Sequence, residues 1–207
     1  MMNQNIIKQR YFEEEISNEV NLSYSDNQVT VTTDYLTLIY TLNSEGYASQ
    51  CVYSLSSQNR IYQFSYSAEG YLTGIVENID DTEYSSTSLT YENGDITSIS
   101  SKMNGLENKF IYEPGEESST YHLPCLGLLE IHPLTFHIEA LYAGLLGKDP
   151  RHFTMHSCPA GSNDEKTVYS YGFDKKGNPS RMICQTTYAG GQASYYPYTR
   201  NISISFE

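Results

Sequence analysis

The sequence predicts a mainly β protein, an antiparallel up-and-down meander of repeated hairpins. The hairpins should form a curved open sheet or half-barrel with one amphipathic helix packed on it. Three observations carry this prediction: glycines recur at a fixed interval, aromatic and polar residues alternate before them, and tyrosine is abundant. The chain of 207 residues contains 20 Tyr and 0 Trp. Tyrosine suits a pleated, half-buried surface, where the ring packs and the hydroxyl stays in water.

The repeat is marked by Gly46, Gly70 and Gly94, since 70 minus 46 and 94 minus 70 both equal 24. The surrounding segments LNSEGYASQC, YSAEGYLTGI and TYENGDITSI align without gaps, and FDKKGNPSRM around Gly177 is a fourth copy. In each copy the third residue after the glycine carries a hydroxyl and the fifth is apolar. The hydroxyl residues are Ser49, Thr73, Thr97 and Ser180, and the apolar residues are Cys51, Ile75, Ile99 and Met182. A period of two residues predicts strands with one buried face.

The turn sequences predict tight hairpins. Asn93-Gly94 is a favoured two-residue hairpin pair, and the Ser-Glu-Gly and Ala-Glu-Gly loops suit a type I turn closed by a left-handed glycine. Further turn signals at 57–59, 80–82 and 104–105 make the chain reverse about every 12 residues, as in a meander.

One helix is predicted from Pro133 to Gly147, with proline at its first position and glycine at its end. Its apolar face comprises Leu134, Ile138, Leu141, Tyr142 and Leu145. The expected role of this face is to cover the apolar side of the sheet. In the alternative, the helix is a lid over an open cavity lined by aliphatic residues and tyrosines.

We expect a single domain over residues 1–207, because all-β domains of this length are common. Within it, hairpin repeats should occupy about 20–113, a helical insertion about 114–165, and final hairpins about 166–207.

The charge balance excludes one class of partner. The formal net charge is −13, which repels nucleic-acid phosphates. Residues 1–10 lack the apolar centre of a signal peptide, and the apolar stretch 134–146 is too short to span a bilayer of ~30 Å. The composition is typical of secreted and surface proteins. We therefore expect an extracytoplasmic location, in the periplasm or at the cell surface, with the signal peptide absent from this chain.

The histidines are concentrated in one region, since all five lie between His122 and His156. His122 and Cys125, together with His152, His156 and Cys158, could offer nitrogen and sulfur ligands to zinc. Their spacing matches no standard metal motif, so loop histidines are the alternative interpretation. A cysteine nucleophile at Cys125 or Cys158 is weaker still, because spacing cannot show an activating environment.

Other chemical signals favour ordinary structure. No Gly-x-Ser-x-Gly elbow, HExxH, Walker loop or GxGxxG is present, so we expect no catalysis and no cofactor. The acidic runs 77–83 and 113–117 lack calcium-loop spacing and are predicted to be solvated turns. The four cysteines are interpreted as small buried residues.

The pattern of the repeat consists of an aromatic residue, a short acidic loop, a glycine, a hydroxyl residue and an aliphatic residue. This pattern resembles the YD repeats of RHS-type proteins. The whole set, with YAGLLGKDP at 142–150, is more similar to an uncharacterised family of secreted lipoproteins of gut Bacteroides. The resemblance covers roughly residues 36–186 and implies the fold, with membrane attachment only through a lipid anchor lost from this chain.

Three functional hypotheses follow. The first is a cell-envelope binding or structural module without catalysis, whose partner could be a protein, a glycan or an apolar ligand. The second is a carrier of an apolar ligand or lipid in a half-barrel cavity. The third is a metal-dependent enzyme that uses the histidine and cysteine residues named above.

Overall fold

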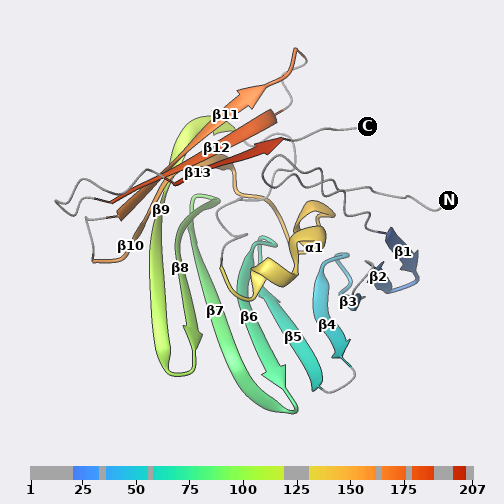
Figure 1. Cartoon of the computed structure of the whole chain (residues 1–207). Coiled ribbons are helices and arrows are strands. Elements are labelled where there is room, and N and C mark those ends of the chain that lie inside the picture. Colours follow the sequence, from blue (N-terminus) through green and yellow to red (C-terminus); the bar gives the residue numbers. More distant parts are fainter. Residues whose placement is uncertain are drawn as a thin grey trace.

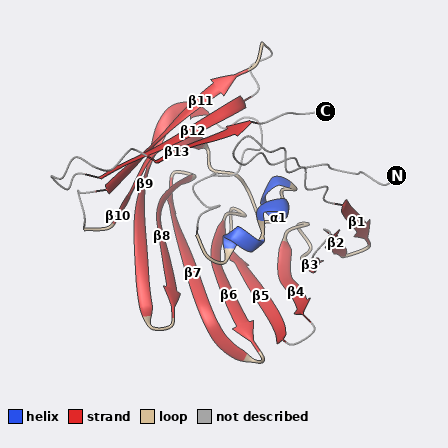
Figure 2. Ribbon diagram, in the orientation of Figure 1, coloured by secondary structure: helices blue, strands red, loops and turns tan. Residues whose placement is uncertain are grey.

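The computed structural model describes residues 21–32, 36–55, 58–118, 131–161, 165–175, 179–188 and 198–203. These residues form one antiparallel sheet and a short helical segment (Figure 2). The strands are β1 (Asn21–Ser25), β2 (Gln28–Thr32), β3 (Thr37–Leu42), β4 (Ala48–Leu55), β5 (Gln58–Tyr66), β6 (Leu72–Ile79), β7 (Thr82–Glu92), β8 (Asp95–Met103), β9 (Leu106–Ser118), β10 (His152–Pro159), β11 (Glu165–Phe173), β12 (Pro179–Tyr188) and β13 (Tyr198–Ser203).

The sheet is an up-and-down meander in which every strand pairs with its neighbour in sequence, from β1 to β13. Within the described ranges no strand pair joins β1 to β13, so the sheet is open. It curves strongly, and β11 to β13 cross above the helical segment that lies on the concave side (Figure 1). The predicted fold class is confirmed. No helix in the described part of the chain is long and apolar enough to cross a membrane.

Three copies of the repeat form the predicted turns, whereas Gly177 of the fourth copy lies outside the described residues. Gly46 and Gly70 have φ of 85° and 92°, and Asn93-Gly94 has φ of 53° and 89°. A glycine closes each of these hairpins, because it has no Cβ and therefore adopts positive φ at little cost. The same turn geometry occurs at Asn104-Gly105, where φ is 52° and 77°.

The recurring hydroxyl of the repeat has a structural role at a β-bulge in two copies. Ser49 Oγ donates a hydrogen bond to the carbonyl of Thr41 at 3.0 Å, and Thr97 Oγ1 donates one to Thr90 at 3.2 Å. The strand register shifts directly after each of these acceptors, between Thr41 and Leu42 and between Thr90 and Tyr91. The hydroxyl therefore satisfies a carbonyl where the extra residue interrupts the ladder. All four apolar positions of the repeat are buried: Cys51, Ile75, Ile99 and Met182.

The helical segment is shorter than predicted. A 3₁₀ turn (η2, Leu134–Phe136) is followed by α1 (Ile138–Tyr142), instead of one helix from Pro133 to Gly147. His137 separates the two with φ −124° and ψ 26°, and Gly144 ends the helical turns with φ 70°. The predicted apolar face is nevertheless correct, since its residues pack against the core: Leu134, Ile138, Leu141, Tyr142 and Leu145. We call residues 131–144 the plug, because they occupy the concave side of the sheet.

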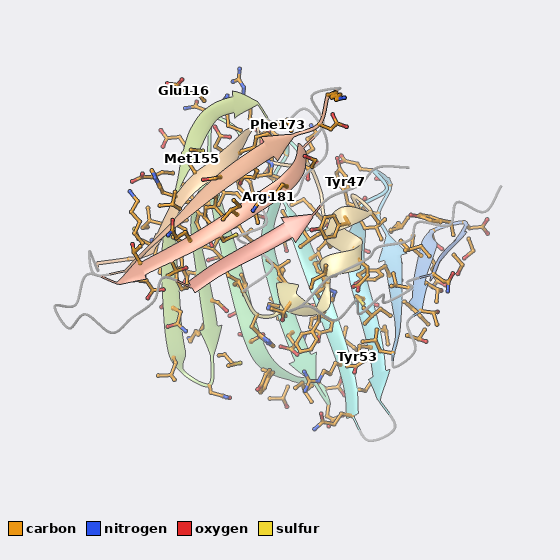
Figure 3. All side chains as sticks on the ribbon, turned by 45° about the horizontal axis from the view of Figure 1, so that its top comes forward. Tyr47, Tyr53, Glu116, Met155, Phe173 and Arg181 are labelled. Carbon is orange, nitrogen blue, oxygen red and sulfur yellow. The ribbon has the colours of Figure 1, made fainter. Side chains whose placement is uncertain are left out.

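The plug continues into residues 145–151, which we call the strap. It crosses three successive repeat hairpins at one end of the sheet. The Ala48 amide donates to Leu145 O at 2.7 Å, the Lys148 amide to Gly70 O at 2.9 Å, and the Arg151 amide to Gly94 O at 2.9 Å. In Figure 3, Tyr47 marks this end of β4 and Tyr53 lies toward the other end.

The strap contacts follow the repeat of the hairpins. One hairpin adds two strands, which is about 9.6 Å of sheet width. The steps from 145 to 148 and from 148 to 151 each bring the strap to the next hairpin. Gly147 allows the close approach, because a Cβ there would lie 2.7 Å from Gly70 O. The YAGLLGKDP segment is thus where the plug ends and the strap begins.

Two predicted solvated turns are corrected. Asp80 and Asp81 form the expected exposed turn, but Glu77 in the same acidic run is on β6 and is fully buried. The second acidic run, 113–117, lies within β9 and pairs with β10. The prediction was wrong for these residues because acidic composition alone does not distinguish a solvated turn from a strand.

Candidate functional site

The centre of the polar interior is Glu77, whose side chain is 0% exposed. Its Oε1 accepts a hydrogen bond from Arg60 Nη1 at 3.1 Å. Its Oε2 accepts one from Ser85 Oγ at 2.7 Å, and lies 2.6 Å from His132 Nε2. Arg60 is on the adjacent strand β5 and Ser85 on β7, whereas His132 belongs to the plug. Glu77 therefore ties the plug to three strands of the sheet.

The environment keeps Glu77 ionised. Burial alone would raise its pKa, but the hydrogen bonds from His132 and Ser85 and the charges of His132 and Arg60 outweigh burial and lower the pKa. An ionised carboxylate only accepts hydrogen bonds. Nε2 of His132 therefore carries the proton in this contact, and Nδ1 faces away from Glu77.

The plug is also fixed through its backbone beside this carboxylate. The carbonyl of His132 accepts hydrogen bonds from Thr87 Oγ1 and from Ser101 Oγ, each at 3.0 Å. Thr87 is on β7 and Ser101 on β8. The side chain and the backbone of one plug residue thus contact three adjacent strands.

His137 lies deeper, with 0% exposure. Its ring is enclosed by Tyr40, Tyr62 and Phe64, with the Tyr62 ring centroid 4.4 Å away in an edge-to-face arrangement. The Tyr40 hydroxyl lies 2.8 Å from its Nδ1. Burial lowers the pKa of His137 to about 3, so the imidazole is neutral. It acts as a polar core residue that positions the plug.

Two of the predicted metal ligands, His152 and His156, lie against different carboxylates. Nδ1 of His152 lies 2.8 Å from Asp95 Oδ2, and the His152 amide donates to Oδ1 of Asp95 at 2.7 Å. Nδ1 of His156 lies 3.1 Å from Glu113 Oε2. Register shifts in the β9–β10 ladder separate the two histidines. The two described histidines of the predicted site, His152 and His156, therefore each pair with a separate carboxylate from the sheet.

His156 and Cys158 do share one surface feature. They line a shallow hollow of ≈ 170 Å³ over β9, β10 and β11. The other lining residues are Ile111, Glu113, Ser157, Glu165 and Lys166. Cys158 is partly exposed, whereas Cys51 and Cys184 are buried. Burial raises the pKa of Cys51 to about 12, so its thiol stays protonated.

No group of three or more His, Cys, Asp and Glu residues in the described ranges is placed to hold a metal ion. His122 and Cys125 lie outside the described residues. The five-residue metal site therefore stays a prediction.

The Glu77 cluster was not predicted, although its signal is present in the sequence. In β6 the inward residue Ile75 is followed two positions later by Glu77, and a period of two places both on one face. Arg60 likewise lies two positions before the buried Tyr62. Charged residues at inward strand positions predict a buried ion pair more directly than local acidic composition does.

These features define the protein as an open, mainly β meander whose concave side holds a helical plug fixed by a buried carboxylate. The chain belongs to the DUF4595 family, a domain of unknown function with a porin-like fold, whose model matches residues 2–181. No curated protein matches the sequence.

Two solved structures are similar to the chain. A porin-like protein from Bacteroides uniformis is 28% identical, with a TM-score of 0.82 over 94% of this chain and 79% of that chain. A porin-like protein from Bacteroides vulgatus is 12% identical, with a TM-score of 0.59 over 98% of this chain and 94% of that chain, and shows the fold alone. The expected likeness to an uncharacterised Bacteroides family is confirmed. The likeness to RHS hairpins and the lipid anchor remain predictions.

Proposed function

We propose that the protein is an extracytoplasmic module of the cell envelope that binds or supports a partner without catalysis. The observation that carries this proposal is the filled concave side of the sheet. Leu134 and Ala140 of the plug are 0% exposed, and Leu141 is 7% exposed. The face that a ligand carrier would leave open is instead part of the core, so partner contacts fall to the outer surfaces and edges.

The envelope location is supported by the porin-like fold of the family and by the Bacteroides relative described above. Attachment through a lipid anchor would place the module at a membrane surface without a spanning helix. The charge of −13 makes a nucleic acid an unsuitable partner. A protein or a glycan is the partner class that we propose.

A carrier of an apolar ligand is less well supported. Such a carrier needs an elongated apolar space, and the plug residues that face the sheet pack against Tyr40, Tyr62 and Phe64. A metal-dependent enzyme is supported only by the pairing of His156 with Glu113 next to Cys158.

The test is to fractionate cells of the source organism and to analyse the purified native protein. We expect the protein in the envelope fraction, a native mass without a stoichiometric bound lipid, and no stoichiometric zinc. Recovery in the cytoplasm would contradict the proposed location. A co-purified lipid would establish the carrier, and stoichiometric zinc would support the enzyme.

A further inference from the structure

We propose that the plug is an acid-released gate on the concave side of the sheet, with the imidazole of His137 as its sensor. The plug packs on the sheet without joining it (Figure 1). In the described ranges, strand pairs link only β1 to β13 and involve no residue of the plug. The two helical turns of the plug, Leu134–Phe136 and Ile138–Tyr142, are too short to be stable alone in water. The plug therefore depends on its contacts with the sheet, and it can open locally while the hairpins stay paired.

The sensor lies in an enclosure of aromatic rings. His137 is 0% exposed, and the ring centroids of Tyr40, Tyr62 and Phe64 lie 5.8, 4.4 and 5.2 Å from that of its imidazole. The hydroxyls of Tyr40 and Tyr62 stay neutral, because burial raises the pKa of both. A second proton on the imidazole would place a full charge among these groups, which compensate it far less than water does. The closed plug therefore resists protonation of His137.

Charged groups on the neighbouring elements do not change this outcome. Burial lowers the pKa of His137 to about 3, and it outweighs the attraction of Glu77 on β6, while the charge of His132 in the plug adds to the lowering. Glu77 also forms an ion pair with Arg60 of β5 at 3.1 Å. Glu139 lies two positions after His137 in α1, and burial raises the pKa of its carboxyl. Glu139 is therefore neutralised more readily than an ordinary carboxylate and offers the imidazole less charge as the pH falls.

The direction of the pH effect follows from the two states of the plug. In the closed state the pKa of His137 is about 3, whereas in an open plug exposed to water it returns to about 6.5. The open state therefore binds more protons between these two values, and acid favours it. The contribution of His137 to closure is complete above about pH 6.5 and is lost as the pH falls toward about 3. From pH 7.5 to pH 5.0 this contribution raises the opening equilibrium constant about 30-fold.

Opening of the gate changes which surface a partner can reach. The side chains that would be uncovered on the sheet are apolar or aromatic, and they include Tyr40, Tyr62 and Phe64. The concave side would then accept an apolar partner in acid, although it is filled at neutral pH. This regulation goes beyond the proposed function and does not depend on the location of the protein.

The first test is hydrogen exchange of the full chain, measured by mass spectrometry at pH 7.5 and pH 5.0 and expressed as protection factors. We expect the plug to lose about 30-fold in protection at pH 5.0, whereas β5 and β6 keep theirs. His137→Asn should abolish this loss, because its amide can still accept a hydrogen bond from the Tyr40 hydroxyl but does not titrate. The matched control is His156→Asn, which removes a partly exposed imidazole on β10 and should retain the loss.

Three results of this experiment would overturn the proposal: equal protection of the plug at the two pH values, an equal loss in His137→Asn, or a parallel loss in β5 and β6. A second measurement needs no variant. Histidine ring signals in the NMR spectrum of the native protein should show His137 still neutral at pH 5.0 in the closed state. Titration of His137 near pH 6.5 with full protection of the plug would also contradict the gate, because the closed plug would then accept the proton.

Discussion

At the scale of single residues, Glu77 connects elements that are distant in sequence. Its carboxylate contacts Arg60, Ser85 and His132, and His132 is 55 positions away along the chain. A buried carboxylate of this kind contributes to stability only while its partners are present. Its removal therefore affects both the sheet and the plug.

We predict that Glu77→Gln destabilises the protein by about 3 kcal/mol, because Arg60 and His132 lose the charge that compensates their partial burial. Urea unfolding at pH 7 measures this difference. The matched control is Glu83→Gln, since Glu83 is exposed in the same acidic run and should change stability by less than about 0.5 kcal/mol. Equal effects of the two substitutions would contradict the assigned role of Glu77.

The Glu77 contribution should also depend on pH. The pKa of Glu77 is lowered in the folded protein, so the unfolded chain binds its proton first as the pH falls. The stabilisation is complete above the unfolded carboxyl pKa of about 4.3 and is lost as the pH falls through the lower folded pKa. The stability difference between the native protein and Glu77→Gln should therefore shrink as the pH falls below about 4.3. Unfolding curves measured across this pH range test the direction of this change. A stability difference that increases below about pH 4.3 would contradict the prediction.

At the scale of elements, the hairpins follow directly from local sequence, whereas the plug does not. Glycine and the Asn-Gly pair set the turns because they tolerate positive φ without help from distant residues. The helix was overestimated because its apolar pattern is continuous across His137. The burial of that imidazole against Tyr40 and Tyr62 is a tertiary effect that a local pattern does not contain.

The strap was not predicted, for a related physical reason. Its partners are the carbonyls of Gly70 and Gly94 and the amide of Ala48, and backbone groups carry no side-chain signature. The Glu77 cluster, by contrast, was accessible from strand alternation. Sequence spacing could not show whether His152 and His156 point to the same side of the sheet, as binding to one metal ion requires. The register shifts in β10 decide which residues share a face.

The contact between plug and repeat gives a prediction at the same scale. We expect Gly147→Ala to destabilise the protein by about 3 kcal/mol, because it combines positive φ with a Cβ only 2.7 Å from Gly70 O. Gly144→Ala is the control, since Gly144 also has positive φ (70°) but has nothing within 4 Å, and should cost about 1 kcal/mol. Thermal unfolding of both variants separates the clash from the backbone strain. Identical losses would show that the close approach to Gly70 is unimportant.

At the scale of the whole molecule, the sheet is held in its curved form by a segment that crosses it. The contacts at Leu145, Lys148 and Arg151 fall on three successive hairpins, and the strap then becomes β10 and joins the sheet. The position of each strap contact is therefore fixed relative to the hairpins. A shift of the chain in the strap displaces its contacts with the sheet.

This shared register can be tested by insertion. One glycine added between Asp149 and Pro150 should break the three-residue step and destabilise the protein by about 2 kcal/mol or more. One glycine added in the turn between Asn104 and Gly105 is the control, because exposed turns tolerate insertions. Urea unfolding and limited proteolysis of the plug measure the effect. If both insertions cost the same, the strap contacts do not determine the register.

The three-residue step also constrains how relatives of this protein can change in length. Duplication of one 24-residue hairpin within the strapped region would widen the sheet by about 9.6 Å and leave the strap too short to reach its last contact. A duplication is therefore compatible with the fold only when three residues are gained in a separate part of the gene. Across the family, each additional hairpin should be accompanied by three additional strap residues. A comparison of segment lengths among relatives would detect this correlation.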